Sequence, residues 1–259
     1  MREELKTAIN EISPDNSGLY AAYISKSDHF CDAENVLLYN IGASAFRVLS
    51  KNGLCFERGS GLIPVSNPYN LSMMSHFYHY SQGSEFRLWE KDILLASWPE
   101  ISIPTLTATS KPHLFWYALK KTEEVNYSCQ KQGAPLKQFG LDIQLHIPEK
   151  AWCNLAILIK PLLDGVISAF HEQSAPCDNR MLQRLSALTN SSEEKIKQLL
   201  CEKIYPVLGA RPIVSAFGKN GIIWNPEDDA CVACRVTVRR NGKNKKWNMK
   251  GQLFSVISK

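Results

Sequence analysis

The C-terminal run "CVACRVTVRRNGKNKKWNMKGQLFSVI", residues 231–257, constrains the fold more than any other segment. Val232, Cys234, Val236 and Val238 alternate with other residues, and this period of two predicts a strand with one apolar face. A cluster of basic residues follows, and a second alternating segment comes after it. The pattern predicts a basic β-hairpin at the C-terminal end of the chain.

Positive charge is concentrated in this hairpin. The last 30 residues contain no Asp or Glu and carry eight Lys and Arg, whereas the preceding 229 residues carry 22 basic and 25 acidic residues, a net −3. Such a distribution favours a polyanionic partner. The alternative is a solvated hairpin whose lysines protect an edge strand from aggregation. The residues expected to bind DNA or RNA are Arg235, Arg239, Arg240, Lys243, Lys245, Lys246, Trp247 (as a base-stacking platform) and Lys250.

The rest of the chain alternates strand and helix patterns, which indicates an α/β (α+β) fold. A helix is expected over 2–12, strands at "GLYAAYIS" and "GLCFERG", and a helix between them. The segment 59–113 is rich in Ser, Pro, Tyr and His and reads as irregular, with short strands or helices whose positions the pattern does not fix. A second series of strand and helix patterns begins near Leu136. It suggests two halves, 1–130 and 131–259, and the second half contains a helical insert at about 174–210.

Composition excludes some classes of protein. The chain of 259 residues is 44% hydrophobic and 21% charged, which is typical of a globular protein, and no segment reads as a membrane span. The N-terminus lacks the apolar core of a signal peptide, so a cytoplasmic location and reduced cysteines are expected. Cys231 and Cys234 form a CxxC, but residues three apart on a strand face opposite ways, and no second such pair exists. We therefore expect structural cysteines and no zinc.

Three carboxylate-containing segments are candidates for chemistry. They are "DAENVLLYNIG" with Asp32 and Glu34, "KPLLDG" with Lys160 and Asp164, and "GIIWNPEDDACV" with Asp228 and Asp229. Each also has an ordinary structural explanation: residues at a helix N-terminus, an i,i+4 ion pair and an acidic turn, respectively.

The order of these motifs in the second half resembles the RusA-type Holliday-junction resolvases, which are small homodimeric DNA endonucleases. Their pattern is Asp-x-Asp-Asn-x-x-Lys-x-x-x-Asp, then a glycine-aromatic strand leading into Asp-Asp, then two basic strands. The resemblance covers residues 141–171 and 220–257 and implies two RusA-like β-α-β units, the second with the insert. It also implies Mg²⁺ held by aspartates, with Lys160 stabilising phosphate charge and Asp164 and Asp228 or Asp229 as ligands.

Each half departs from that pattern in a different way. In the second half, Asn154 and Ala156 stand where the family has its two leading aspartates. The first half keeps Asp32, Glu34 and Asn35 in the spacing Asp-x-Glu-Asn, but Leu38 and Gly42 stand at the lysine and later aspartate positions. Each half thus retains what the other has lost. The candidate metal ligands are Asp32, Glu34, Asp164 and Asp229.

Three functions follow as hypotheses. The first is a nucleic-acid-binding protein with a degenerate RusA-like fold and impaired catalysis, in which the basic residues of the C-terminal hairpin form one cationic ribbon next to the acidic pocket. The second is a Mg²⁺-dependent structure-selective endodeoxyribonuclease that uses the carboxylates and Lys160. The third is a non-enzymatic subunit of a nucleic-acid-processing or defence complex, with the aromatic segment around 67–89 as a protein interface. Oligomerisation is compatible with all three, and no membrane association is expected.

Overall fold

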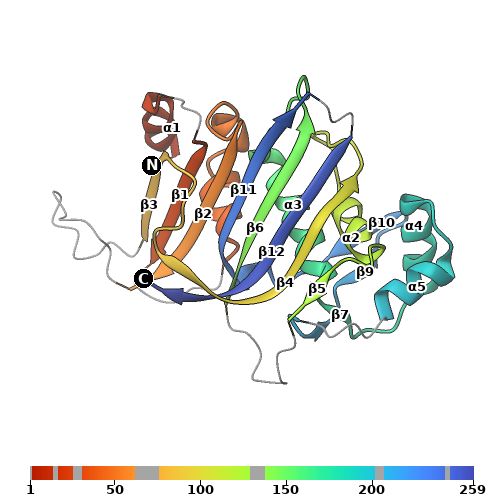
Figure 1. Ribbon diagram of the computed structural model, residues 1–259. Coiled ribbons are helices and arrows are strands. Elements are labelled where there is room, and N and C mark those ends of the chain that lie inside the picture. Colours follow the sequence, from red (N-terminus) through yellow and green to blue (C-terminus); the bar gives the residue numbers. More distant parts are fainter. Residues whose placement is uncertain are drawn as a thin grey trace.

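A computed structural model describes residues 2–13, 17–25, 31–61, 76–128, 138–201, 207–242 and 246–259. Its main feature is an eight-stranded mixed sheet with the order β3-β1-β2-β11-β6-β12-β4-β5 (Figure 1). The strands are β1 (Leu19–Ser25), β2 (Gly53–Ser60), β3 (His76–Gln82), β4 (Trp89–Ile103), β5 (Asn126–Tyr127), β6 (Phe139–Pro148), β11 (Cys231–Asn241) and β12 (Trp247–Ser258).

The strands predicted from alternation are present. β1 and β2 pair in parallel, and β11 lies between β2, to which it is antiparallel, and β6, to which it is parallel. β12 returns antiparallel to β6, so β11 and β12 lie on either side of β6. The two predicted strands exist, but the prediction that they pair with each other as a hairpin was wrong. Strands from 131–259 occupy the centre of the sheet and strands from 1–130 flank them on both sides. One sheet therefore joins the two expected halves.

The helices gather on one face of this sheet (Figure 1). α3 (Leu155–Ala169) covers the centre and packs against α2 (Pro112–Lys120). The short turns η1 (Asn35–Tyr39) and η2 (Ala43–Phe46) complete the layer. α3 comes very close to α2 because it carries Gly165, where a Cβ would collide with the carbonyl oxygen of Pro112. The main apolar core lies between this layer and the sheet.

The opposite face of the sheet is largely polar, and the segment that follows β3 packs across part of it. Buried Glu57 on β2 fixes this segment, because its carboxylate accepts the backbone N–H groups of Arg87, Leu88 and Trp89 at 2.7–3.2 Å. The hydroxyl of Tyr20 donates to the same carboxylate at 2.6 Å. The main sheet therefore has a covered helical face and an open polar face.

The remaining elements include the helical insert and correct one prediction. α1 (Arg2–Glu11) confirms the N-terminal helix, and α4 (Asn179–Thr189) and α5 (Glu193–Cys201) lie within the predicted insert. The prediction that 59–113 is irregular was wrong in its described part, since it contains β3 and the fifteen-residue β4. Four short strands form two small sheets: β7 (Glu172–Gln173) pairs with β8 (Ala210–Arg211), and β9 (Val214–Phe217) pairs with β10 (Gly221–Trp224). No described helix is both long and apolar enough to span a bilayer.

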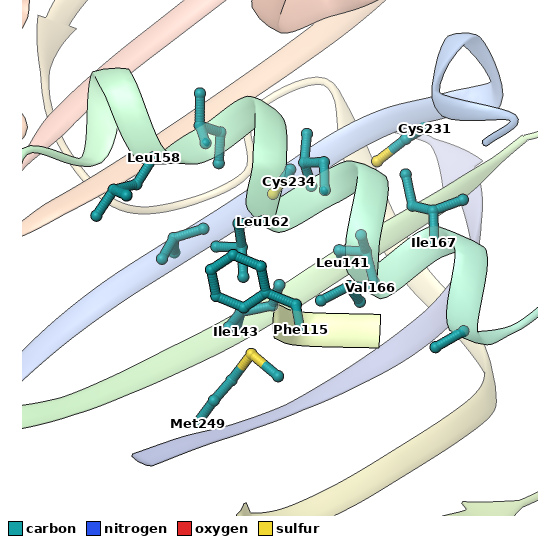
Figure 2. Packing of buried hydrophobic residues seen from close by; sticks show 14 of the residues in the cluster. Phe115, Leu141, Ile143, Leu158, Leu162, Val166, Ile167, Cys231, Cys234 and Met249 are labelled. Atoms are coloured by element: carbon teal, nitrogen blue, oxygen red, sulfur yellow. The ribbon is translucent and has the colours of Figure 1, made fainter. Parts of the chain in front are cut away.

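The CxxC lies in the core beneath α3. Cys231 and Cys234 are both almost completely buried in the main cluster (Figure 2). The prediction that their sulfurs diverge was wrong, because the register of β11 shifts between Cys231 and Ala233 and restores both residues to one face. Burial raises the pKa of both thiols well above the ordinary value, as expected for cysteines that act as core residues.

Candidate metal site

Asp32 and Glu34 lie where the chain enters the turn η1. The Asp32 backbone carbonyl accepts the N–H groups of Asn35 and Val36, and the Asn35 amide donates to Asp32 Oδ2 at 2.5 Å. Glu34 makes no capping hydrogen bond with its side chain, which is only 1% exposed. The expected role of Glu34 as a first-turn residue therefore does not account for its position. Its carboxylate is directed into the protein, toward Lys160.

Lys160 and Asp164 lie one turn apart on α3, so their side chains share one face of the helix. Lys160 Nζ lies 3.2 Å from Asp164 Oδ1. This is the ion pair that the i,i+4 spacing predicts. It is not an isolated surface pair, because Lys160 also reaches carboxylates from two other segments.

Asp228 reaches the same place from η3 (Asp228–Ala230), which directly precedes β11. Its carboxylate is largely buried and accepts a hydrogen bond from Lys160 Nζ. The neighbouring Asp229 is held by its backbone, since Arg58 Nη2 donates to the Asp229 carbonyl at 2.7 Å. The carboxylate that meets those of Asp32 and Glu34 is that of Asp228, and not that of Asp229, which was the predicted metal ligand.

The four carboxylates converge on one ammonium group. Lys160 Nζ lies 3.4 Å from Asp32 Oδ2 and 3.1 Å from Glu34 Oε1, in addition to its contacts with Asp164 and Asp228. The first half of the chain supplies Asp32 and Glu34, and the second half supplies the other three residues. The two incomplete motifs therefore combine into one cluster.

Burial and mutual repulsion shape the ionisation of this cluster. Burial raises the pKa of Glu34 to about 7 and that of Asp164 to about 7, against the attraction of Lys160 and with added repulsion from Asp228. Burial also raises the pKa of Asp228. For Lys160, burial alone would lower the pKa, but the charges of Glu34, Asp164 and Asp228 raise it well above the ordinary value. Four carboxylates facing one ammonium leave an excess of negative charge.

The arrangement could hold a divalent metal ion. Asp32, Glu34 and Asp228 each offer a carboxylate oxygen, and these oxygens lie within 4.8 Å of one another. Carboxylate oxygens are the ligands that Mg²⁺ prefers. Glu34 Oε1 and Asp164 Oδ1 are buried without hydrogen-bond geometry to any described donor, although each lies at ion-pair distance from Lys160. These two oxygens have lone pairs that no described hydrogen bond uses and that a further cation could take up. The residues therefore fit the ion that the RusA resemblance implies.

Two predicted nucleic-acid contacts in the hairpin need correction. Arg235 was expected to face a phosphate chain, but its guanidinium pairs with Asp142 through Nε–Oδ1 at 3.0 Å and Nη2–Oδ2 at 2.5 Å. Trp247 was expected to stack on a base, but it is 4% exposed and belongs to the main core. An arginine with a carboxylate partner and an enclosed indole are poorly available to a nucleic acid.

The other hairpin cations divide between the two faces of the sheet, because successive strand residues point in opposite directions. Arg239 and Lys250 border a polar hollow of about 450 Å³ on the open face. Arg240 points the other way and donates to Asn52 Oδ1 at 2.9 Å and to the Lys51 carbonyl at 3.1 Å. Lys246 is exposed, and Lys243 and Lys245 lie outside the described residues. The predicted single cationic ribbon is therefore split.

The expected adjacency of ribbon and acidic pocket was also wrong. Asp228 precedes the first residue of β11, whereas the basic turn follows its last, and eleven strand residues span about 35 Å. Arg235 and Arg239 also lie on the open face, while Lys160 belongs to α3 on the covered face.

Sequence reasoning missed three residues beside the cluster. Tyr39 donates its hydroxyl to the Ile157 carbonyl of α3 at 3.0 Å, and burial, with the nearby charges of Glu34 and Asp164, raises its pKa to about 12. Further along, the Arg47 guanidinium lies 4.4 Å from the ring centroid of Trp152. Nothing in the sequence places η1 and η2 beside α3, so no local pattern could have indicated these contacts.

Comparison with protein-family models, curated proteins and solved structures found no match.

Proposed function

We propose that the protein is a divalent-metal-dependent nuclease that hydrolyses phosphodiester bonds in DNA, with a site assembled from two RusA-like half motifs in one chain. The observation that supports this proposal is the convergence of Asp32, Glu34, Asp164 and Asp228 on Lys160. Gathering four carboxylates, three of them largely buried, around a single ammonium is a poor way to stabilise a fold, because the buried groups lose hydration and all four repel one another. Strongly perturbed, clustered acids are more typical of functional sites.

Each residue has a role that its position supports. Asp32, Glu34 and Asp228 would hold the metal ion, which when bound polarises a phosphoryl oxygen and activates water. Asp164 does not belong to this triad, and its carboxylate would accept the proton of the attacking water. Lys160 is within reach of all four carboxylates and would turn its ammonium toward the phosphate as negative charge develops.

The reaction would be an ordinary hydrolysis. The water oxygen forms a bond to phosphorus, the ester P–O bond breaks, and the leaving oxygen takes up a proton. The products are a phosphate monoester and a hydroxyl group, and the reaction requires no oxidant or further co-substrate.

The competing candidate is a nucleic-acid-binding protein that does not cut. The observation in its favour is that the Lys160 ammonium occupies the centre of the carboxylates, where it offsets part of their charge without any metal. In that case the cluster is an internal salt bridge network and neither Mg²⁺ nor Mn²⁺ changes the behaviour of the protein.

A cleavage assay separates the two candidates. Labelled branched, flap and linear DNA are incubated with the purified protein in Mg²⁺, Mn²⁺ or EDTA. We expect metal-dependent cleavage that is lost in Asp228→Asn and Glu34→Gln and retained in Glu193→Gln, whose exposed carboxylate lies on α5 away from the cluster. Cleavage that persists in both site variants, or wild-type protein that cuts none of the substrates, would reject the nuclease.

A further inference from the structure

A surface beside the carboxylate cluster has features that suit the binding of a single nucleic-acid strand, and we call this surface the track. It follows α3 from Trp152, just before the helix, past the contact between Tyr39 and Ile157, to Lys160 and Asp164. Trp152 is 50% exposed although it is a large aromatic residue, and Tyr39 is 36% exposed. Exposed aromatic rings in line with a reaction centre are the kind of surface on which unpaired bases stack.

Cations surround the outer end of this track. Arg47 stacks on Trp152, and exposed Lys51 is linked to Arg240 through its carbonyl. Arg240 points to the helical side of the sheet, opposite to Arg239, and its guanidinium donates to Asn52 Oδ1 and to the Lys51 carbonyl. The N-terminal end of α3, which carries the positive end of the helix dipole, lies beside this group. The predicted nucleic-acid residue Arg240 therefore belongs to this surface and not to the open face.

The spacing suits a short stretch of single strand. From Asn154 to Lys160 the helix rises about 9 Å. Trp152 lies two residues before Asn154, which adds at most about 7 Å. The total is at most about 16 Å, which gives room for no more than roughly five nucleotides if each takes the 3.4 Å that it has along one strand of a duplex.

We propose that single-stranded DNA binds along α3, with a base stacked on Trp152, its backbone beside Arg47 and Arg240, and its scissile phosphodiester at the carboxylate cluster. This inference rests on the proposed nuclease function and specifies its substrate as DNA that is unpaired for several nucleotides on one side of the cut. Stacking and phosphate contacts carry little sequence information, so binding depends weakly on sequence.

The open face is the alternative binding surface, and it is less suited to a polyanion. Its Arg235 is bound to Asp142, and Lys91 also pairs with Asp142 at 2.5 Å. Arg239 and Lys250 remain exposed there. A variant that lacks both of these cations tests this face without touching α3.

The experiment measures the anisotropy of a labelled oligothymidylate at low salt in EDTA, so that binding is read without cleavage. We expect Trp152→Ala to weaken binding roughly tenfold, since one base–aromatic stack is lost, and Trp152→Phe to restore part of it. We expect Arg47→Ala to lower the slope of log affinity against log salt by about 0.7. Phe217→Ala, which truncates an aromatic residue that is 64% exposed elsewhere, is the matched control and should bind like the wild type.

Two results would overturn the track: equal binding by Trp152→Ala and the wild type, or a large loss on replacing Arg239 and Lys250 together. Unchanged secondary structure by circular dichroism verifies that each variant is folded. The outcome is separable from that of the nuclease proposal. If binding depends on Trp152 but no DNA is cleaved, the track stands and the nuclease proposal is rejected. If cleavage depends on Asp228 but binding does not depend on Trp152, the nuclease proposal stands and the track is rejected.

Discussion

Replacing Asp228 by Asn distinguishes a functional cluster from a structural salt bridge through stability alone. In an ordinary buried ion pair, removing one partner costs about 3–5 kcal/mol because it leaves an uncompensated charge. Here Asp228 is attracted by Lys160 and repelled by Asp32 and Glu34. The two effects can be compared from the geometry of the cluster.

At an effective dielectric constant of about 20, a contact of about 2.8 Å between opposite charges is worth about 6 kcal/mol. Each pair of carboxylate oxygens at 4.8 Å or less repels by at least about 3.5 kcal/mol at the same dielectric constant. Asp228→Asn therefore removes about 6 kcal/mol of attraction and at least about 7 kcal/mol of repulsion. We expect the free energy of unfolding to rise by about 1 kcal/mol or more, because the repulsion that is removed exceeds the attraction.

The assay is urea unfolding at pH 7.5, followed by tryptophan fluorescence, in EDTA and again in Mg²⁺ or Mn²⁺. The wild type should gain stability from the ion, because a ligand that binds only the folded state stabilises it, and the variant should not. A loss of more than about 3 kcal/mol in EDTA would refute the reasoning, because it would make Asp228 a structural partner of Lys160.

Two further predictions concern other parts of the molecule. Burial would raise the pKa of Asp142, but hydrogen bonds and charges from Arg235 and Lys91 hold this pKa below its ordinary value. The ionised Asp142 therefore stabilises the fold at any pH above the unfolded pKa of about 3.9. This stabilisation is lost as the pH falls toward the pKa of Asp142 in the folded state. Asp142→Asn should flatten the acid limb of unfolding free energy against pH, and an unchanged limb would contradict this. Separately, the sulfur atoms of Cys177 and Cys201 lie 3.7 Å apart. Oxidised glutathione should therefore convert these two thiols into a disulfide by exchange, with two molecules of reduced glutathione released. The bond would link the start of α4 to the end of α5 and stabilise the chain by roughly 3 kcal/mol; thiols that stay reactive would count against it.

Local patterns predicted those parts of the fold that depend on local sequence. The alternation of 231–240 predicted β11 almost to its observed bounds, and the helical pattern of 158–173 predicted α3 with its two ends displaced by three and four residues. β4 was missed because it contains Pro99 and several charges, and because its register against β12 shifts at three places, which breaks the period of two. The divergence predicted for the CxxC failed for the same reason, at the irregularity near Cys231.

The candidate site shows where sequence reasoning stops. Asp32, Glu34, Lys160 and Asp164 each stood out by residue type and spacing, but their meeting depends on β11 inserting between β2 and β6, a pairing of segments far apart in the chain. No local signal specifies that neighbourhood. The choice of Asp228 over Asp229 likewise depends on the tertiary structure, which brings the Asp228 carboxylate to Lys160 and to the carboxylates of Asp32 and Glu34. The predicted ribbon failed because residues adjacent in sequence alternate between two faces of a sheet.

The most direct test of the central claim is a Mn²⁺ titration of the wild type and Asp228→Asn, followed by electron paramagnetic resonance of the unbound ion. Our account predicts saturable binding by the wild type and its loss in the variant, with Glu193→Gln unchanged as the control for a general effect of charge. Equal uptake by wild type and Asp228→Asn, or no uptake by either, would mean that Lys160 alone balances these carboxylates and that the cluster is not a metal site.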